Sequence, residues 1–466
     1  MHSLLDPIFT VDGSLKSLPA ILHELSTGTV VSFDHLRRHQ KRAWHSFLVQ
    51  TAAMIGPDDL RDWGPEQWEE TLASHGRAMW RLESEYDSPA FMQPPVSDAN
   101  SRKDITDNWS EVPTPDEADV LSTTAGHTLK DETIRQPRPE HWIFAIVTTQ
   151  TTGWYAGGGG AWQAGVRMNK GYSDRPYVSL VSDLDWGSLF RSDVGTAREM
   201  PERGDIKFLW KLPYHKTVTL EDCHTLFVEI CRRFRFYEGK LYREGAARRI
   251  PSAEDRLGAV DDPWIPIDVT GKKPNAFSTR AAGYTYPWVQ KLLAGENYKT
   301  PSLEIRSEEP QYFIAESLAT DRTMTAGFHS RAVHIPADAI KVLKDRRDKF
   351  ASRSKARVQV ASVVKEKALR HALKVLKEID LSDNEGYKKL QKWESSYESA
   401  VDRVFFEDLW ESVDQDQTEA QREWKKRVVG FAEDELERAK STVSDTRKWK
   451  LWPKAQSIFY SKVQDL

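Results

Sequence analysis

The chain has 466 residues, too many for one ordinary hydrophobic core, and this length predicts about two or three domains. Hydrophobic residues make up 39% and charged residues 29%, which excludes a disordered chain, and the net charge of −4 excludes a protein that coats nucleic acid through an overall basic field. Two cysteines exclude a disulfide framework and a four-cysteine zinc site. Without a signal-like N-terminus or an apolar run of about 20 residues, we expect a cytoplasmic protein with no membrane contact.

Helical periodicity dominates the first 80 residues. The predicted elements are a strand at 4–11, a helix at 18–25 closed by Gly28, a helix at 33–55, and a helix from Pro65 that carries Trp68, Leu72 and Trp80. Residues 87–140 are rich in Pro, Ser, Thr and Asp and predict a long irregular connection, which in compact domains is usually functional or disordered.

The middle of the chain alternates between short segments of both types. The predicted elements are an apolar helix at 141–152, strands at 177–181, 208–212, 217–220 and 239–243, a helix at 221–235, and loops with strands at 261–312. After Pro336, apolar residues follow helical spacing through four segments joined by short polar loops. We therefore expect an α+β fold, with a mixed domain at 1–340 and an antiparallel four-helix bundle at 341–466.

Four consecutive glycines form the most distinctive motif: Gly157, Gly158, Gly159 and Gly160. Glycine is costly to order, so the run suits a place where the backbone approaches another molecule closely. The cations and the amide that follow suit phosphate contacts beside such a loop: Arg167, Asn169, Lys170 and Arg175. The same run is equally compatible with a surface turn between two strands.

Other motifs carry less chemistry. His35 and His39 have the i, i+4 spacing of a helical metal site, but Leu36 stands where a zincin has glutamate, and we expect no metal or other cofactor. Cys223 and Cys231 are expected to be buried on the predicted helix. No nucleophile elbow or phosphate-binding loop occurs. Acidic pairs such as 183/185 and 261/262 are common on surfaces, so no catalytic constellation emerges and we expect a non-enzymatic protein.

Basic residues concentrate between 344 and 374, including Arg353 and Arg357. Such a helix face either follows a nucleic-acid backbone or is simply solvated. A second basic-aromatic patch alternates arginine with phenylalanine at 232–236, a pattern that ordinary strand or helix amphipathicity also produces.

Four segments together resemble the CasA family, the large subunit of the type I-E CRISPR surveillance complex Cascade. They are Pro89-Ala-Phe-Met-Gln-Pro94, residues 119–130, the glycine segment 150–176, and residues 319–326. The resemblance is nearly end to end in order, and each motif alone is weak. It implies recognition of the protospacer-adjacent motif (PAM) in duplex DNA, promotion of unwinding and R-loop formation, and recruitment of a helicase-nuclease. RNA pairing would then supply sequence specificity while the protein reads a short motif.

By position, the resemblance assigns roles to four groups of residues. The glycines at 157–160 would lie in the minor groove, with Lys272 or Lys273 as a minor-groove lysine. A wedge that splits the first base pairs would consist of Asp321, Arg322, Thr323, Met324 and Thr325. A loop that meets guide RNA and neighbouring Cascade subunits would include Thr123, Thr124, His127 and Lys130. Some family members carry glutamine in the wedge, so Met324 would act here as an apolar intercalator.

Two alternatives from other classes remain open. One is a metal-dependent hydrolase that uses His35 and His39 with an acidic ligand. The other is a helical scaffold that does not bind DNA and whose glycine loop only connects strands.

Overall fold

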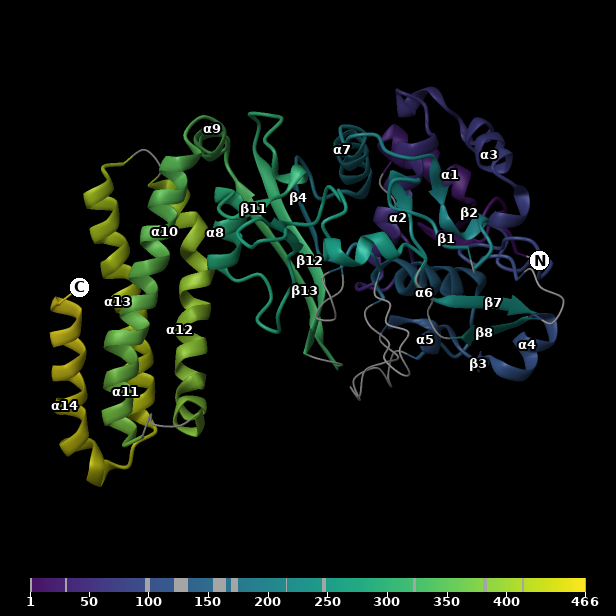
Figure 1. Ribbon diagram of the computed structural model, residues 1–466. Coiled ribbons are helices and arrows are strands. Elements are labelled where there is room, and N and C mark those ends of the chain that lie inside the picture. Colours follow the sequence, from purple (N-terminus) through teal and green to yellow (C-terminus); the bar gives the residue numbers. More distant parts are fainter. Residues whose placement is uncertain are drawn as a thin grey trace. The chain divides into compact units, whose positions relative to one another are not determined.

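The computed structural model describes residues 2–29, 32–96, 101–120, 133–153, 165–168, 175–214, 216–244, 249–321, 324–379, 384–412 and 415–465. Helices and small sheets are mixed, and a helical region ends the chain, so the predicted α+β class is confirmed (Figure 1). Two compact units are present. Unit 1 holds Met1–Tyr284, Asn297–Glu304 and Gln311–His334, and unit 2 holds Thr285–Glu296, Ile305–Pro310 and Ile335–Leu466. The predicted boundary at 340 leaves the two short segments of unit 2 in the first domain.

Unit 1 is built from helices around a shared core. Its helices are α1 (Leu18–Thr27), α2 (Lys41–Ile55), α3 (Pro65–Ser74), α4 (Ser101–Asn108), α5 (Pro115–Ala118), α6 (Pro139–Thr152) and α7 (Trp186–Arg198). Short 3-10 helices lie at Leu60–Asp62, Arg77–Trp80, Leu209–Lys211, Pro251–Arg256 and Pro301–Leu303.

Five small sheets accompany these helices in the described part of the chain. The strands are β1 (Phe9–Val11), β2 (Ser14–Lys16), β3 (Ser110–Val112), β4 (Tyr177–Val181), β5 (Ile206–Phe208), β6 (Cys223–Val228), β7 (Arg233–Tyr237), β8 (Lys240–Glu244), β9 (Ile267–Asp268), β10 (Asn275–Ala276), β11 (Tyr298–Lys299), β12 (Gln311–Asp321) and β13 (Met324–Ile335). Their orders are β1-β2, β3-β8-β7, β5-β6, β10-β9-β11 and β13-β12-β4, and only β5 and β6 are described as a parallel pair.

Helix α1 shows how local sequence sets these elements. The Ser17 side chain accepts a hydrogen bond from the Ala20 N–H at 3.3 Å and so caps the N-terminus. Gly28 ends the helix with φ +87°, a left-handed conformation that favours glycine. Leucines and isoleucine between these caps are buried at helical spacing, as the sequence predicts.

Aromatic side chains fill the core of unit 1. Trp44 of α2 packs against Phe9, Phe47 and Phe144, with ring centroids 5.2–5.3 Å apart. Trp44 is fully buried, like most of the large side chains around it. The abundant tryptophans therefore serve mainly as core residues, with α2 and α6 held together through them.

A polar network is buried in the same unit. His45 of α2 hydrogen-bonds through Nε2 to Asp193 of α7 at 2.7 Å, and Asp193 also accepts from Ser179 at 3.1 Å and from the Tyr177 hydroxyl. Burial lowers the pKa of His45, because the charged imidazolium would lose its hydration. Buried polar groups are tolerated when they are hydrogen-bonded, so this network fixes α2 and α7 against β4.

Several sequence predictions for unit 1 are wrong. The strands predicted at 208–212 and 217–220 are not formed, since Leu209–Lys211 is a 3-10 helix and 217–220 has no strand, and the helix from Pro65 ends at Ser74, before Trp80. The predicted helix at 221–235 is instead strands β6 and β7, because β-branched residues and alternating Arg and Phe fit a pleated strand. Helix α2 begins at Lys41, since residues 33–40 form turns. The connection predicted as irregular at 87–140 contains α4, β3 and α5. By contrast, the strand at 177–181 and the apolar helix ending at 152 are confirmed.

Unit 2 is helical. Its helices are α8 (Tyr286–Ala294), α9 (Ala337–Asp345), α10 (Arg347–Val363), a π-helical turn (Val364–Leu369), α11 (Arg370–Lys377), α12 (Asn384–Glu411), α13 (Gln417–Ser441) and α14 (Asp445–Gln464). The π turn joins α10 and α11 into one long helix, which together with α12, α13 and α14 forms the four predicted helices of the C-terminal region (Figure 1). Helices α8 and α9 were not predicted.

The core of unit 2 is also aromatic. Phe405 of α12 contacts Tyr286 of α8 and Trp424 of α13, with ring centroids 4.7 and 5.6 Å away. The Tyr397 hydroxyl donates to the Ala361 carbonyl at 2.9 Å, so a buried polar end is satisfied. Throughout the described part of the chain, every helix is too short or too polar to traverse a bilayer.

Candidate nucleic-acid interface

Gly153 and Gly165, which flank the run of four glycines, meet at the end of α6. Gly153 donates its N–H to the Thr149 carbonyl at 3.1 Å, and Gly165 donates to the Gly153 carbonyl at 3.4 Å, which closes the base of the stretch. A β-carbon on Gly153 would lie 2.2 Å from the Thr149 oxygen, and one on Gly165 would lie 2.9 Å from Glu229 Oε2. Gly153 therefore requires glycine, because the clash is with backbone, whereas a side chain at residue 165 would displace the ends of Met168 and Glu229. The four consecutive glycines at 157–160 lie outside the described residues.

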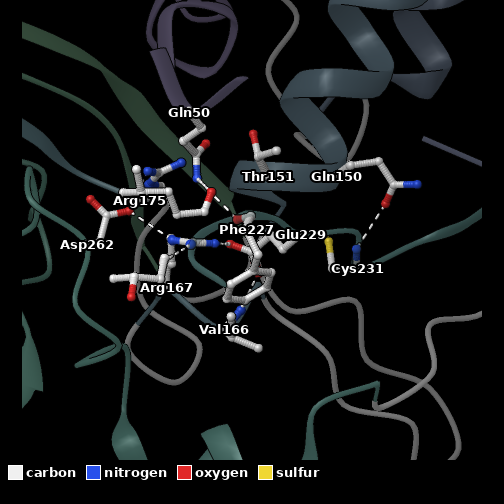
Figure 2. Close-up of polar contacts among 12 residues, drawn as sticks. Gln50, Gln150, Thr151, Val166, Arg167, Arg175, Phe227, Glu229, Cys231 and Asp262 are labelled. Carbon is white, nitrogen blue, oxygen red and sulfur yellow. Dashed lines mark hydrogen bonds and ion pairs between the residues drawn. The ribbon is translucent and has the colours of Figure 1, made fainter. Parts of the chain in front are cut away.

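Arg167 and Arg175, predicted to contact phosphates, lie inside unit 1. Arg167 ion-pairs through Nε with Asp262 Oδ2 at 3.1 Å and through Nη1 with Glu229 Oε1 at 3.5 Å, and Arg175 pairs with the same Asp262 oxygen (Figure 2). Arg167 is 1% exposed and Arg175 is 6% exposed. The predicted phosphate role does not fit this burial, because both guanidinium groups are engaged by internal carboxylates. Asn169 and Lys170 lie outside the described residues.

Burial shapes the electrostatics of this cluster. It raises the pKa of the Glu229 carboxyl, although the neighbouring guanidinium groups oppose that shift. It also lowers the pKa of Arg175, which Asp262 counteracts. Glu229 further accepts a hydrogen bond from the Val166 N–H at 2.6 Å, so the backbone just after Gly165 is tied to the cluster.

Gln150, one turn before Gly153, joins three parts of the chain. Its Oε1 accepts from the N–H groups of Cys231 and Arg232 at 3.0 and 2.7 Å. Its Nε2 donates to the carbonyls of Met92 and Arg232, each at 2.9 Å. The side chain is fully buried and forms hydrogen bonds with every polar group it has. The end of α6 is thereby fastened to the segment at 89–94 and to the β6–β7 connection. Figure 2 shows the contact of Gln150 with Cys231.

The segment at 89–94, which carries part of the family resemblance, is interior. Phe91, Met92 and Gln93 are fully buried. The Gln93 side chain donates to the Leu82 carbonyl at 2.8 Å and accepts from the Phe236 N–H at 2.6 Å. This motif therefore supports the structure behind the glycine segment.

Lys272 and Lys273 are exposed on the turn between β9 and β10. Asp268 shapes that turn by accepting hydrogen bonds from the backbone N–H and the hydroxyl of Thr270, at 2.8 and 2.6 Å. Because Lys272 and Lys273 are exposed, a polyanion can reach them.

The predicted wedge lies at the end of the long hairpin formed by β12 and β13. Strand β12 is the middle strand of its sheet and pairs with β4 from Tyr312 opposite Val181 to Glu316 opposite Tyr177. Asp321 ends β12 and Met324 begins β13, with Thr325 following, while Arg322 and Thr323 lie outside the described residues. The hairpin is braced by Glu316, which ion-pairs with Arg42 of α2 and accepts from the Ser330 hydroxyl of β13.

Three cations of the basic stretch in unit 2 pair with acidic residues of α12. Arg357 is 3% exposed and pairs with Asp408, while Lys365 pairs with Glu398 and Arg370 with Glu394, both at 2.6 Å. The residue numbers of the acids on α12 fall as those of the paired cations rise, so α12 runs antiparallel to the long helix formed by α10 and α11. The phosphate contact predicted for Arg357 does not fit its burial.

Arg353 is half-buried at the C-terminal end of α12. It donates to the carbonyls of Ser412 and Gln415 at 3.5 and 3.0 Å. A cation at a helix C-terminus complements the helix dipole. Its described contacts are therefore structural, and its predicted phosphate contact stays a prediction.

The histidine pair does not have the predicted helical placement. His35 and His39 lie in the turns before α2, and His39 Nε2 is 3.0 Å from both oxygens of Asp119. Within the described ranges, no three His, Cys, Asp or Glu side chains are grouped to hold a metal ion. The loop residues Thr123, Thr124, His127 and Lys130 lie outside those ranges.

Both cysteines are buried, as predicted, although they lie on or after strand β6 and not on a helix. Burial raises the pKa of each thiol to about 11. They therefore behave as small apolar side chains.

These features define an α+β chain in which a glycine-rich stretch, an exposed lysine turn and a long hairpin belong to one unit and a helical region follows. Over its whole length, the fold is that of CasA, also called Cse1. The structure of Thermus thermophilus CasA (Cse1) is 13% identical with TM-score 0.68, covering 100% of this chain and 99% of that chain. Cse1 from Acidimicrobium ferrooxidans is 16% identical with TM-score 0.67 and coverage of 100% and 98%, and Cse1 from Thermobifida fusca is 11% identical with TM-score 0.58 and coverage of 100% and 97%.

The resemblance indicated by the sequence motifs is thus confirmed at the level of the fold. Neither a scan against protein-family models nor a search of curated proteins gave a match.

Three residues that anchor the glycine segment were not predicted as part of the site: Gln150, Glu229 and Asp262. Asp262 was interpreted as half of a surface acidic pair, but it is 2% exposed and neutralises two arginines. Glu229 gave one usable signal, since it is a lone acid inside an otherwise apolar run at 226–231. An isolated charge in a buried strand requires a partner.

Proposed function

We propose that this chain is the large subunit of a type I-E Cascade complex. In this role it recognises the PAM in duplex DNA, promotes unwinding and R-loop formation, and recruits the helicase-nuclease. The observation that carries the proposal is agreement with the CasA fold over 100% of this chain and 99% of the Thermus thermophilus CasA chain, at TM-score 0.68. Its partners are guide-RNA-containing Cascade subunits and target DNA in the cytoplasm, and it acts by binding, with no catalytic step of its own.

The glycine segment supports PAM recognition. The Gly165–Gly153 hydrogen bond of 3.4 Å holds together the two residues that flank the run of four glycines. A stretch without side chains brings backbone N–H and carbonyl groups close to a narrow minor groove. The exposed lysines at 272 and 273 add phosphate or groove contacts. A short local contact of this kind suffices because guide RNA pairing reads the rest of the target.

The β12–β13 hairpin supports the unwinding step. It is braced at Glu316 by Arg42 and Ser330, which stiffens the described part of the hairpin. Met324 begins the returning strand, where an apolar side chain suits insertion between base pairs. A rigid projection beside the recognised motif would favour opening of the first base pairs.

The hydrolase alternative has less support. It would rely on His35 and His39, but His39 is held by Asp119 and lies in a turn. Metal analysis of the purified protein separates the proposals, since stoichiometric zinc or manganese would favour the hydrolase. The scaffold alternative predicts that no variant of the glycine segment alters DNA binding.

The direct test assembles the chain with Cascade partner subunits and guide RNA and measures binding to duplexes with or without the PAM, and to single-stranded target. Gly158→Asp and Gly159→Asp are expected to weaken PAM-dependent duplex binding by about tenfold or more, because a carboxylate is placed against phosphates. Pairing to single-stranded target should stay intact. An equal loss on both substrates would contradict groove recognition.

A matched control is Gly195→Asp. Gly195 is exposed on α7, and a β-carbon there would meet no atom within 4 Å. The same change of charge and residue type is therefore accommodated elsewhere in unit 1. This variant should bind both duplexes like the unmodified protein.

A further inference from the structure

Four buried charged side chains meet in unit 1 beside the described ends of the glycine segment: Arg167, Arg175, Glu229 and Asp262. We call this group the stem clamp (Figure 2). Arg167 and Arg175 both reach Asp262, and Arg167 also reaches Glu229. The two arginines belong to the glycine segment at 150–176, whereas the two acids come from positions more than 50 residues further along the chain.

The stem clamp is balanced in charge and sealed from water. Each member is at most 6% exposed. The guanidinium of Arg167 lies 4.3 Å from the Phe227 ring centroid, and that of Arg175 lies 5.4 Å from the Trp264 ring centroid. Burying four charges costs so much hydration that apolar residues often give equal or better stability. Stability alone therefore does not account for the arrangement.

The stem clamp instead controls backbone position. Glu229 Oε2 accepts from the Val166 N–H at 2.6 Å, and Gly165 provides the space that this carboxylate needs. Arg167 follows directly and is held by the Thr225 carbonyl at 3.2 Å as well as by the two acids. The backbone at 165–168 is thus held by charge-assisted hydrogen bonds to Glu229, and Arg175 is held by its ion pair with Asp262.

We infer that the stem clamp is a set of positioning residues that aims the glycine segment at the DNA, and that Arg167 and Arg175 do this from inside the protein without contacting phosphate. The inference rests on the proposed function for its DNA consequence. The effect of the stem clamp on the backbone at 165–168 does not depend on DNA and can be measured in the isolated protein. The two consequences are measured separately.

The informative variant is the double substitution Arg167→Met with Glu229→Leu. It removes one base and one acid, so Arg175 and Asp262 remain as a balanced pair, and apolar replacement of a buried pair is commonly tolerated. The Val166 N–H loses its acceptor. A second variant, Glu229→Asp, keeps the charge and shortens the side chain by one methylene, so it tests reach without changing net charge.

The matched control is Arg138→Met with Glu140→Leu at the opposite end of α6. Glu140 is also buried and accepts a backbone N–H, from Thr10 at 2.7 Å, and Arg138 lies 4.0 Å from it. The same two substitutions therefore disturb a similar contact about 20 Å away along the helix.

Hydrogen–deuterium exchange of the isolated protein gives the conformational result. In both stem-clamp variants, amides in peptides covering 165–168 should exchange at least about tenfold faster, because a charge-assisted hydrogen bond is lost or weakened. The control double variant should leave these peptides unchanged. Unaltered exchange at 165–168 in both stem-clamp variants would overturn the inference.

Assembled Cascade gives the functional result. The stem-clamp double variant should lose about tenfold or more of its preference for PAM-containing duplex while thermal unfolding and single-stranded target binding match the control. A double variant with faster exchange but full PAM preference would overturn the positioning role. If the unmodified complex shows no PAM preference while exchange responds as expected, the proposed function fails and the conformational claim holds.

Discussion

Gln150 gives the sharpest test of how the base of the glycine segment is built. Replacing it with leucine keeps the approximate volume but removes both polar groups of a fully buried side chain. Four backbone groups then lose their partners: the N–H groups of Cys231 and Arg232 and the carbonyls of Met92 and Arg232. An unsatisfied buried group costs about 1–3 kcal/mol, so even the low end predicts a loss of about 4 kcal/mol. The free energy of unfolding of a domain is only about 5–15 kcal/mol, so this substitution would remove a large part of the stability of unit 1.

Urea unfolding followed by tryptophan fluorescence measures this loss, since most tryptophans of unit 1 are buried. Gln150→Glu is the paired variant: it keeps the acceptor for two N–H groups but buries a carboxylate against two carbonyl oxygens, so a loss is expected at neutral pH that becomes smaller at acid pH, where the protonated carboxyl can donate. A free energy of unfolding within about 1 kcal/mol of the unmodified protein for Gln150→Leu would refute the reasoning.

Three further predictions concern other parts of the molecule. Cys223 and Cys231, with pKa values raised to about 11 by burial, should resist iodoacetamide at neutral pH in the folded protein and react after urea unfolding; modification of the folded protein would contradict their burial. Arg357→Met should lower the free energy of unfolding of unit 2, measured in urea, by about 2–4 kcal/mol because it breaks a buried ion pair with Asp408. Lys355→Met removes an exposed pairing partner and should lower it by less than about 1 kcal/mol. Equal losses would be inconsistent with the burial of Arg357. Burial lowers the pKa of His141 from 6.5 to about 4, so the unfolded chain binds more protons and the protein becomes less stable as the pH falls from about 6.5 to 4. In His141→Gln, the urea midpoint should fall less over this pH range than in the unmodified protein. An unchanged dependence of the midpoint on pH would count against this reasoning.

Local patterns were sufficient for elements whose apolar residues repeat every three to four positions. The helix closed by Gly28, the apolar helix ending at Thr152 and the C-terminal helices follow this rule, because burial of one face is encoded in nearby residues. The strands β6 and β7 were misread because short apolar runs fit either period, and their partners lie elsewhere in the chain.

The candidate site was predictable in the same uneven way. The glycine run is visible in the sequence, where it fits either close backbone contact or a surface turn, and the wedge was assigned through the family resemblance. The stem clamp was not predictable, because Glu229 and Asp262 meet Arg167 only after folding. A cation beside a glycine loop looks the same in sequence whether it faces phosphate or a buried carboxylate.

The most direct measurement is a structure of the assembled complex bound to a PAM-containing duplex. The account predicts that the backbone of residues 157–160 lies in the minor groove at the PAM, with Arg167 and Arg175 still paired to acids inside the protein. Residues 157–160 distant from every nucleotide, or both arginines turned outward onto phosphates, would contradict it.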